Sequence, residues 1–383
     1  MRNWLLPEHI ADILPATARQ VESAKAAMLD LFRSAGYELV SPPLIEYADS
    51  LISEGDDALD LKTFKLVDQL SGRQLGLRAD ITPQVARIDA HLLSGRQGVT
   101  RLCYAGSVVH ALPSGLMSSR EPLQVGAELY GYAGIEADEE IIALMLEVLS
   151  QAGVAGLRLD LGHVGIFRAL AAAAGLSHKA TRELFLALQG KDVGTVNELA
   201  GRLAEPWRAA VLALPELYGP ADVLARARAV LPPLPEIDAA LDQLAALGDA
   251  LKGQAEIGFD LAELRGDDYH TGLVYAAYAP GWSEALARGG RYDNVGERFG
   301  RARPATGFSL DLRDLIRILP ERDSVRGIRV AAAQLPAAKA EIARLRAAGE
   351  VVLIDYLGES AEALYCDREL IPAASGWQVV PFN

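Results

Sequence analysis

The chain has 383 residues, of which 50% are hydrophobic, and its 51 acidic and 37 basic residues give a formal net charge of −14 at pH 7. This length exceeds that of one compact core and predicts one large and one small domain. The negative charge repels polyphosphate backbones, so we do not expect a nucleic-acid partner. No apolar run reaches the roughly 18 residues of a membrane span, and Pro7 interrupts the first apolar residues. We therefore expect a soluble, cytoplasmic protein that does not contact a membrane.

The two cysteines, Cys103 and Cys366, are far apart in the sequence. They show neither CxxC spacing nor clustered histidine neighbours, so the sequence predicts no disulfide framework and no metal site. We expect both to be small buried hydrophobic side chains.

The first elements are a helix and a strand. Apolar residues recur at three- and four-residue spacing from about residue 16 to 35, which predicts an amphipathic helix that ends at Gly36. Residues 37–43 predict an extended strand that a pair of prolines closes.

A hairpin is predicted over residues 64–78, because two alternating apolar runs flank Ser71-Gly72. It leads to Asp80 and Thr82, directly before a helix that begins at Pro83 and continues to about residue 92. These two side chains are candidates either for ligand binding or for capping that helix.

Two further strands are predicted at residues 101–109 and 122–132. In the second, Gln124, Gly126 and Glu128 share one face, and four strand residues span roughly 13 Å. Gln124 and Glu128 could therefore hold opposite ends of one small ligand over a floor at Gly126. The alternative is a half-exposed strand with a solvated polar face.

The middle of the chain is predominantly helical. Acidic residues open a predicted helix from about residue 138 to 149, and residues 157–161 alternate as in a strand. From about 164 to 250 the sequence is rich in Ala and Leu and interrupted by prolines, which predicts an insertion of several short helices.

A polar cluster follows this insertion. Residues 265–272, Arg-Gly-Asp-Asp-Tyr-His-Thr-Gly, come directly before a predicted strand at 273–278, and we expect a small polar ligand there. The Gly pair within residues 288–294 lacks the spacing of nucleotide-binding loops, so we interpret it as a turn. Residues 306–315 predict a strand that leads into a helix.

The last part of the chain predicts a small βαβαβ unit, with strands at about 328–331, 351–354 and 377–380. The expected domains are thus 1–325, which includes the insertion, and 326–383. The glycines of the small unit do not match a dinucleotide-binding fingerprint, and we expect no cofactor.

Four segments, in this order, resemble the catalytic core of histidyl-tRNA synthetase: Leu77-Arg-Ala-Asp-Ile-Thr82, Gln124-Val-Gly-Ala-Glu128, Arg265-Gly-Asp-Asp-Tyr-His-Thr-Gly272 and Gly289-Gly-Arg-Tyr-Asp293. The likeness covers roughly residues 1–320. It implies an α+β fold, in which the antiparallel sheet of a class II aminoacyl-tRNA synthetase is flanked by helices. It also implies dimerisation through the first helix and strand.

The resemblance implies a histidine-binding pocket as well. Carried over position by position, Asp80 and Thr82 match residues that hold the amino group of histidine. Gln124 faces the amino-acid backbone, and Glu128 lies near the imidazole.

The other matches come from the polar cluster. Arg265 matches the arginine beside the carboxylate, and Tyr269 and His270 match the aromatic pair beside the ring. Acids, an amide and an arginine suit a zwitterion with an imidazole, because each buried charge needs a partner.

Two positions depart from the synthetase pattern. His110 stands where the family has an arginine that binds the ATP phosphates, and it lacks that residue's permanent charge and fork of donors. Asp314 stands where an arginine stacks on adenine. Losing such donors typically costs on the order of 10²-fold each, so we expect very weak adenylate formation.

A synthetase-like chain with a histidine pocket but without ATP and tRNA contacts is similar to the regulatory subunits of ATP phosphoribosyltransferase. Segments 365–370 and 377–383 fit that family better than the synthetase. This resemblance implies a non-catalytic chain that pairs with the short-form catalytic subunit at the first step of histidine biosynthesis. It further implies L-histidine as feedback effector and a homodimer within a hetero-oligomer. The alternatives are an active histidyl-tRNA synthetase and a structural scaffold that does not bind histidine.

Overall fold

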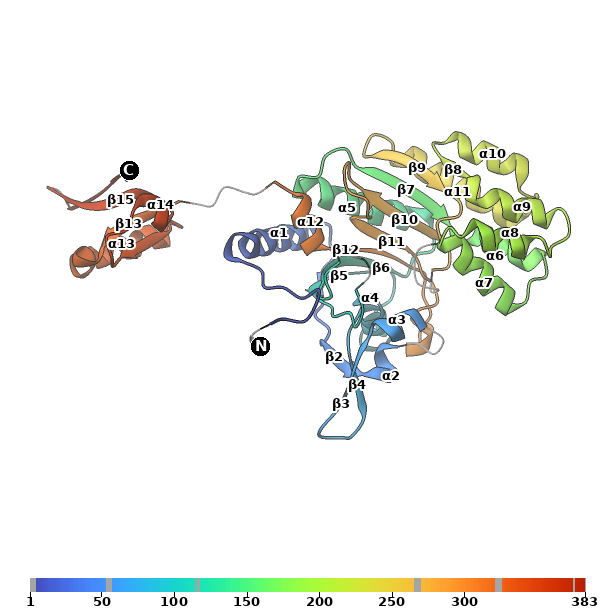
Figure 1. Ribbon diagram of the computed structural model, residues 1–383, viewed down its shortest axis with the longest axis horizontal. Helices are drawn as coiled ribbons and strands as arrows, with labels where there is room; N and C mark the ends of the chain where they lie inside the picture. The colour runs from blue at the N-terminus through green and yellow to red at the C-terminus, as the bar shows by residue number, and fades with distance from the viewer. Residues whose placement is uncertain are drawn as a thin grey trace. The chain divides into compact units, whose positions relative to one another are not determined.

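The computed structural model describes residues 5–52, 57–113, 115, 118–264, 270–320, 326–374 and 376–382. The chain forms two compact units, Met1–Leu319 and Pro320–Asn383, which Figure 1 shows as a larger and a smaller body. The larger unit contains the candidate site.

Among the described residues, nine strands form the central sheet of the larger unit, in the order β1-β5-β6-β12-β11-β10-β7-β9-β8. Only the β1–β5 and β7–β9 pairs in this sheet are parallel. The expected α+β fold is therefore confirmed, with a mixed sheet in which antiparallel pairs predominate. The strands are β1 (Glu38–Leu39), β5 (Thr100–Ser107), β6 (Leu123–Tyr130), β12 (Ala305–Asp311), β11 (Ala287–Arg291), β10 (Leu273–Tyr278), β7 (Arg158–His163), β9 (Glu256–Asp260) and β8 (Tyr218–Gly219).

Helices α1 (Pro15–Ser34), α5 (Ile135–Ala152) and α12 (Leu312–Ile318) pack on this sheet (Figure 1). The helix predicted near the start of the chain is thus confirmed as α1. It buries Met28 and Phe32 at a four-residue spacing, and the Phe32 ring meets that of Phe308 on β12 edge-on at 6.0 Å. Gly36 follows with a φ of 86°, a conformation that glycine adopts without strain.

The strand predicted at residues 37–43 is much shorter than expected, because only the two residues of β1 pair with β5. The chain then enters a three-stranded sheet of order β2-β4-β3. Its members are β2 (Ile45–Tyr47), β3 (Phe64–Val67) and β4 (Gln74–Leu77), and helices α2 (Ala48–Leu51) and α3 (Asp57–Lys62) lie between β2 and β3 along the chain. The hairpin formed by β3 and β4 confirms the prediction for residues 64–78.

The helix predicted from Pro83 begins one residue earlier, as α4 (Thr82–Arg87). It continues directly into one π-helical turn, η1 (Ile88–Leu92). The insertion is helical as predicted, apart from the two-residue strand β8 and a 3₁₀ turn. Its helices are α6 (Val164–Ala173), α7 (His178–Gln189), α8 (Val193–Ala200), α9 (Trp207–Ala213), α10 (Asp222–Val230) and α11 (Pro235–Ala250), and the turn is η2 (Leu214–Glu216).

The prediction of a turn at residues 288–294 is wrong. Most of this segment belongs to β11, which pairs with β10 on one side and β12 on the other. A Cβ atom at Gly289 would lie 2.5 Å from the ring of Tyr275, and one at Gly290 would lie 2.8 Å from Nε2 of His270. The glycines therefore make room for neighbouring side chains within the sheet. The segment leads on to the short 3₁₀ helix η3 (Glu297–Phe299).

The small unit contains one strand more than the predicted βαβαβ pattern. Its sheet has the order β14-β13-β15-β16, and β15 was not predicted. The last strand, β16, runs antiparallel to β15. The elements are β13 (Gly327–Ala331), η4 (Ala332–Gln334), α13 (Leu335–Ala347), β14 (Val352–Asp355), α14 (Ala361–Leu364), β15 (Cys366–Ala373) and β16 (Gly376–Pro381).

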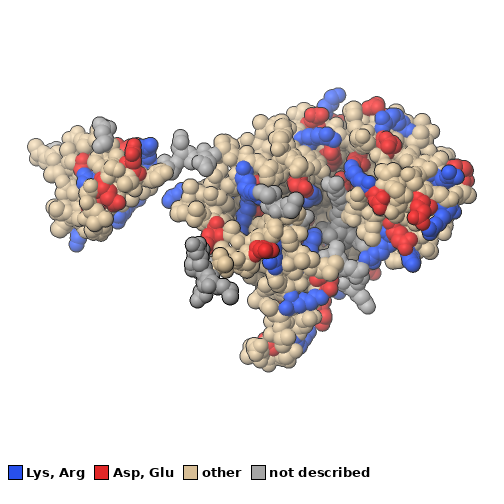
Figure 2. All heavy atoms as spheres, viewed as in Figure 1, with Lys and Arg blue, Asp and Glu red and all other residues tan. Residues whose placement is uncertain are grey.

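Four global features bear on function. Within the ranges given above, no helix combines the length and apolar character that crossing a membrane requires. The same residues contain no group of three His, Cys, Asp or Glu side chains that could hold a metal ion. On the face in Figure 2, acidic and basic side chains are interspersed. Cys103 and Cys366 are buried free thiols, as predicted.

Candidate functional site

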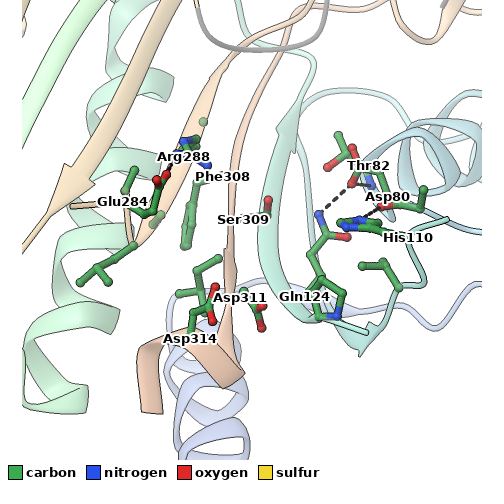
Figure 3. Close-up of a pocket in the computed structure, with 18 of the residues that line it drawn as sticks. Asp80, Thr82, His110, Gln124, Glu284, Arg288, Phe308, Ser309, Asp311 and Asp314 are labelled. Carbon is green, nitrogen blue, oxygen red and sulfur yellow. Dashed lines mark hydrogen bonds and ion pairs between the residues drawn. The ribbon is translucent and has the colours of Figure 1, made fainter. Parts of the chain in front are cut away.

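A cavity of about 710 Å³ lies in the larger unit, beside the middle strands of the central sheet. Five of the seven predicted site residues line it: Asp80, Thr82, Gln124, Glu128 and His270. The other two, Arg265 and Tyr269, lie outside the described residues. In Figure 3, Asp80, Thr82, His110 and Gln124 form one side of the cavity, and Glu284 and Arg288 lie on the other.

The register of β6 places Gln124 and Glu128 on the cavity face. Glu128 lies opposite Leu102 of β5 and Gly307 of β12. The alternative of a solvated strand face is wrong for Glu128, since only 1% of this residue is exposed. The residue between the two on this face, Gly126, pairs with Tyr104. A Cβ at position 126 would lie 2.5 Å from the Tyr104 hydroxyl, so the glycine lets that ring extend toward Glu128.

Three hydroxyl groups surround the carboxylate of Glu128. Thr82 Oγ1 and Tyr104 OH each donate a hydrogen bond to Oε1 over 3.0 Å. Tyr292 OH donates to Oε2. Burial raises the pKa of Glu128 to about 8, although the hydroxyls from Tyr292, Tyr104 and Thr82 act in the opposite direction. Burial thus disfavours the charged form of this carboxyl group, whereas the three donated hydrogen bonds favour it.

Asp80 and Gln124 form a second polar centre. Gln124 Nε2 donates to Asp80 Oδ1 over 2.7 Å, and Gln124 Oε1 accepts from the backbone N–H of Ile81. The N–H of Thr82 also donates to Asp80 Oδ1. Asp80 thus supports the start of α4 and lines the cavity at once, so the capping and ligand-binding interpretations are compatible for this residue. Thr82 does not cap the helix, because its hydroxyl bonds to Glu128.

The base of the β3–β4 hairpin holds this side of the cavity in place. The Arg78 guanidinium is buried and donates to the carbonyl oxygens of Pro42 and Ser107. His110 Nε2 lies 3.0 Å from the carbonyl oxygen of Ala79. Burial lowers the pKa of His110, so this ring is neutral near pH 7.

The end of the cavity near Gln124 contains further acidic groups (Figure 3). Asp311 accepts hydrogen bonds from the backbone N–H groups of Leu123 and Arg313 at the start of α12. Burial, followed by the neighbouring Asp314, raises the pKa of Asp311 to about 6. Asp314 itself forms an ion pair with Arg317 over 3.2 Å. Two carboxyl groups disfavour the binding of a polyphosphate at this end.

Sequence reasoning missed two residues that hold Glu128. Tyr292 belongs to the Gly289-Gly-Arg-Tyr-Asp293 segment, which carried part of the resemblance but no assigned role. Tyr104 lies on β5, and only its pairing with Gly126 brings its hydroxyl to the acid. The available signal was the alternation of side chains along β5. It places Tyr104 on the same face as Leu102, which lies opposite Glu128.

The chemistry of the site favours binding. The Asp80–Gln124 centre offers a carboxylate and an amide carbonyl, which suit an ammonium group. The Glu128 centre offers a carboxyl group in a hydroxyl-rich, buried environment, which suits a nitrogen heterocycle. The two centres are joined by Thr82, so one small ligand can contact both.

Family models of known proteins match most of both units of the chain. The family model for histidyl-tRNA synthetase matches residues 9–315. The model for the C-terminal domain of the ATP phosphoribosyltransferase subunit HisZ matches residues 325–380. The first covers the central sheet, the cavity and the insertion, and the second covers most of the small unit.

Individual relatives match along the whole chain. A Chromobacterium violaceum protein named ATP phosphoribosyltransferase regulatory subunit is 75% identical over 383 residues, which is 100% of both chains. A protein of the same name from Laribacter hongkongensis is 65% identical over 98% of this chain and 97% of its own. A solved structure from Bacillus halodurans, described as an ATP phosphoribosyltransferase regulatory subunit/histidyl-tRNA synthetase, superposes with a TM-score of 0.83 at 27% identity. It covers 95% of this chain and 96% of its own.

Proposed function

Because the chain belongs to the family of ATP phosphoribosyltransferase regulatory subunits, we propose that it is the non-catalytic regulatory subunit of that enzyme at the first step of L-histidine biosynthesis. It is required for the activity of a short-form catalytic subunit, and it transmits feedback inhibition by histidine. The observation that carries the histidine-sensing part is the cavity in which Asp80, Thr82, Gln124, Glu128 and His270 come together.

L-Histidine fits the two polar centres. Its ammonium group binds at Asp80 and Gln124, where both hydrogen bonds to Asp80 use Oδ1 and leave Oδ2 for the ligand. Its imidazole ring binds at Glu128, beside His270. Arg265 and Tyr269 complete the site at the carboxylate and the ring, as the resemblance to the synthetase implies. Each charged or polar group of the ligand then has a partner, which a buried site requires.

Two positions that carry ATP-binding arginines in the synthetase pattern hold other side chains in this chain. His110 occupies the position of the phosphate-binding arginine, and its neutral ring lies against the Ala79 carbonyl. Asp314 occupies the position of the adenine-stacking arginine, and it lies beside the half-buried Asp311. A neutral ring and two carboxyl groups attract a nucleotide triphosphate far less than two arginines do. The chain therefore binds histidine without activating it.

Regulation requires the partner subunit. Histidine can inhibit the complex only if it binds one arrangement of the subunits more tightly than another, because equal affinity for two states shifts nothing. The regulatory chain acts as a homodimer within a hetero-oligomer, with the first helix and strand at its dimer interface. The catalytic subunit then responds to histidine that is bound on a different chain.

Calorimetric titration tests the ligand assignment. We expect saturable heat with L-histidine and none with ATP. Glu128→Ala should weaken histidine binding by roughly tenfold to a hundredfold, because it removes a buried hydrogen-bonding partner. Glu198→Ala, at a side chain on the surface of the insertion, serves as the matched control and should bind as the unchanged chain does. Normal histidine binding by Glu128→Ala would show that the pocket is misassigned.

The match of the synthetase family model over residues 9–315 supports a second candidate, an active histidyl-tRNA synthetase. Histidine-dependent exchange between ATP and pyrophosphate distinguishes the two, and we expect none. A scaffold that does not bind histidine is the third candidate. It predicts no heat with either ligand and normal support of the catalytic subunit.

A further inference from the structure

The helical insertion reaches the cavity through one side chain. Of the described residues that line the cavity, Gln189 alone belongs to the insertion. It is the last residue of α7, a helix that buries Leu184 and Leu188 on one face. The ring of Phe185 on the same helix lies 5.8 Å from that of Phe167 on α6. Because α7 is anchored in this way, Gln189 meets the cavity from a fixed position.

Gln189 holds the chain directly before the polar cluster. Its Nε2 donates a hydrogen bond over 3.3 Å to the carbonyl oxygen of Leu264, a residue that is only 1% exposed. Two residues after Gln189, Lys191 Nζ lies 3.3 Å from Oδ2 of Asp260 at the end of β9. The Lys191 side chain is more than half exposed, so this ion pair contributes little to stability. The partly buried hydrogen bond from Gln189 is therefore the main link between α7 and this segment.

The insertion also holds the chain directly after His270, which belongs to the polar cluster and lines the cavity. The backbone N–H of Val164, the first residue of α6, donates to the carbonyl oxygen of Gly272 over 3.0 Å. Helix α6 packs against β10, the strand that follows Gly272 (Figure 1). The insertion thus fixes a residue on each side of His270 in the sequence, Leu264 before it and Gly272 after it.

We propose that the helical insertion is part of the ligand-binding machinery, with Gln189 as a positioning residue that sets the place of His270 in the cavity. This proposal rests on the proposed function, since it concerns the site for the same histidine. Without its hydrogen bond from Gln189, the Leu264 carbonyl loses the restraint that α7 provides. Binding must then order the chain beside His270, and that ordering reduces the affinity for the ligand. The insertion thereby raises the histidine affinity of a pocket that is otherwise built from the rest of the larger unit.

The same coupling acts in the other direction, because linkage between two events is reciprocal. A ligand that contacts His270 should stabilise the contacts that hold its neighbours in the sequence, and so the end of α7 and the start of α6. Backbone N–H groups there, including that of Val164, should exchange more slowly with solvent deuterium when histidine is bound. Helix α10 has no described residue in the cavity, and its exchange should not change.

The test is calorimetric titration of the full chain with L-histidine, comparing the unchanged chain with Gln189→Met and Gln151→Met. Gln189→Met keeps a side chain of similar length but removes the donor. We expect histidine affinity to fall by roughly threefold to tenfold, the effect of one lost hydrogen bond. Gln151→Met is the matched control, because Gln151 is exposed on α5 and donates to Glu147 on the same helix. It should bind histidine as the unchanged chain does.

A double-mutant cycle separates positioning from a general loss of packing. If Gln189 acts through His270, the loss due to Gln189→Met should shrink to less than about twofold in a His270→Phe background. In an Asp80→Asn background, at the ammonium-binding centre, the loss should keep its full size. A structural defect that weakened the whole pocket would add to the effect of either background.

Equal histidine affinity of Gln189→Met and the unchanged chain would overturn the inference, as would a loss of the same size in all backgrounds. Both results would leave the proposed function intact. Should Gln189→Met fail to fold, hydrogen exchange of the unchanged chain decides, because identical exchange at the end of α7 and the start of α6 with and without histidine contradicts the coupling. No histidine binding by the unchanged chain would instead reject the proposed function, and this inference with it.

Discussion

Gly307→Ala is the substitution that the geometry of the site forbids most clearly. A Cβ at this position would overlap Oε2 of Glu128 and would lie 2.8 Å from the carbonyl oxygen of Ala127. The first conflict involves a carboxyl group that three hydroxyls hold in place, and the second involves the backbone of the neighbouring strand. Neither neighbour can yield without breaking a hydrogen bond or moving β6.

The expected cost has two parts. Overpacking of a well-packed core costs about 1–3 kcal/mol. Displacing Glu128 from its hydroxyl partners adds about 1–3 kcal/mol, the typical penalty for buried polar groups left unsatisfied. We therefore expect the free energy of unfolding to fall by roughly 2–6 kcal/mol and histidine binding to be lost.

Denaturant unfolding measures the loss of stability, and calorimetric titration with L-histidine measures the loss of binding. Gly95→Ala is the matched control, because a Cβ at residue 95 meets nothing within 4 Å, and it should leave stability and binding unchanged. A Gly307→Ala chain with unchanged stability and unchanged histidine affinity would refute the described packing of Glu128 against β12.

Three further predictions concern charge. Asp80→Asn keeps the shape of the side chain but removes its charge, so histidine affinity measured by calorimetry should fall by roughly tenfold or more; an unchanged affinity would contradict the ammonium assignment. Arg291→Ala leaves Asp138, 2.7 Å away and buried, without its cation, and should lower the free energy of unfolding in urea by about 3–5 kcal/mol; a loss below about 1 kcal/mol would contradict this. Because the pKa of Glu128 is raised, the ligand-free protein should lose stability as pH rises from about 4.5 to 8. Thermal melts at several pH values measure this loss, and Glu128→Gln should make it smaller. Equal slopes of stability against pH for the two chains would contradict a raised pKa at Glu128.

The local parts of the site could be predicted from the sequence. Alternation along β6 placed Gln124 and Glu128 on one face, and the hairpin signal placed Asp80 at the end of β4. These inferences depend on the two-residue alternation of side chains along a strand and on the residue types of a tight turn. Both signals lie entirely within a short segment of sequence. The resemblance to the synthetase then indicated which ligand such a face would hold.

The contacts across the sheet could not be predicted in this way. Gly126 was interpreted as the floor of the pocket, whereas its role is to admit the ring of Tyr104 from the neighbouring strand. The glycines of β11 were interpreted as a turn because a lone Gly pair usually is one. Their actual neighbours, Tyr275 and His270, are remote enough in sequence that only strand pairing brings them there.

The missed strand of the small unit has a similar explanation. Residues 366–373 contain several charged side chains, so their alternation of buried and exposed positions is weak in the sequence. In the structure, Arg329 on β13 pairs with Glu369 on β15 and with Asp355 at the end of β14. The charges that obscure the strand in the sequence thus pair across the sheet.

We propose that this chain senses histidine on behalf of a separate catalytic subunit. The most direct test is the transferase activity of the short-form catalytic subunit, measured alone and with this chain, over a range of L-histidine concentrations. We predict that activity requires this chain, that histidine inhibits the complex, and that Glu128→Ala preserves activity while weakening inhibition by at least about tenfold. Full activity of the catalytic subunit alone, or undiminished inhibition with Glu128→Ala, would contradict the account.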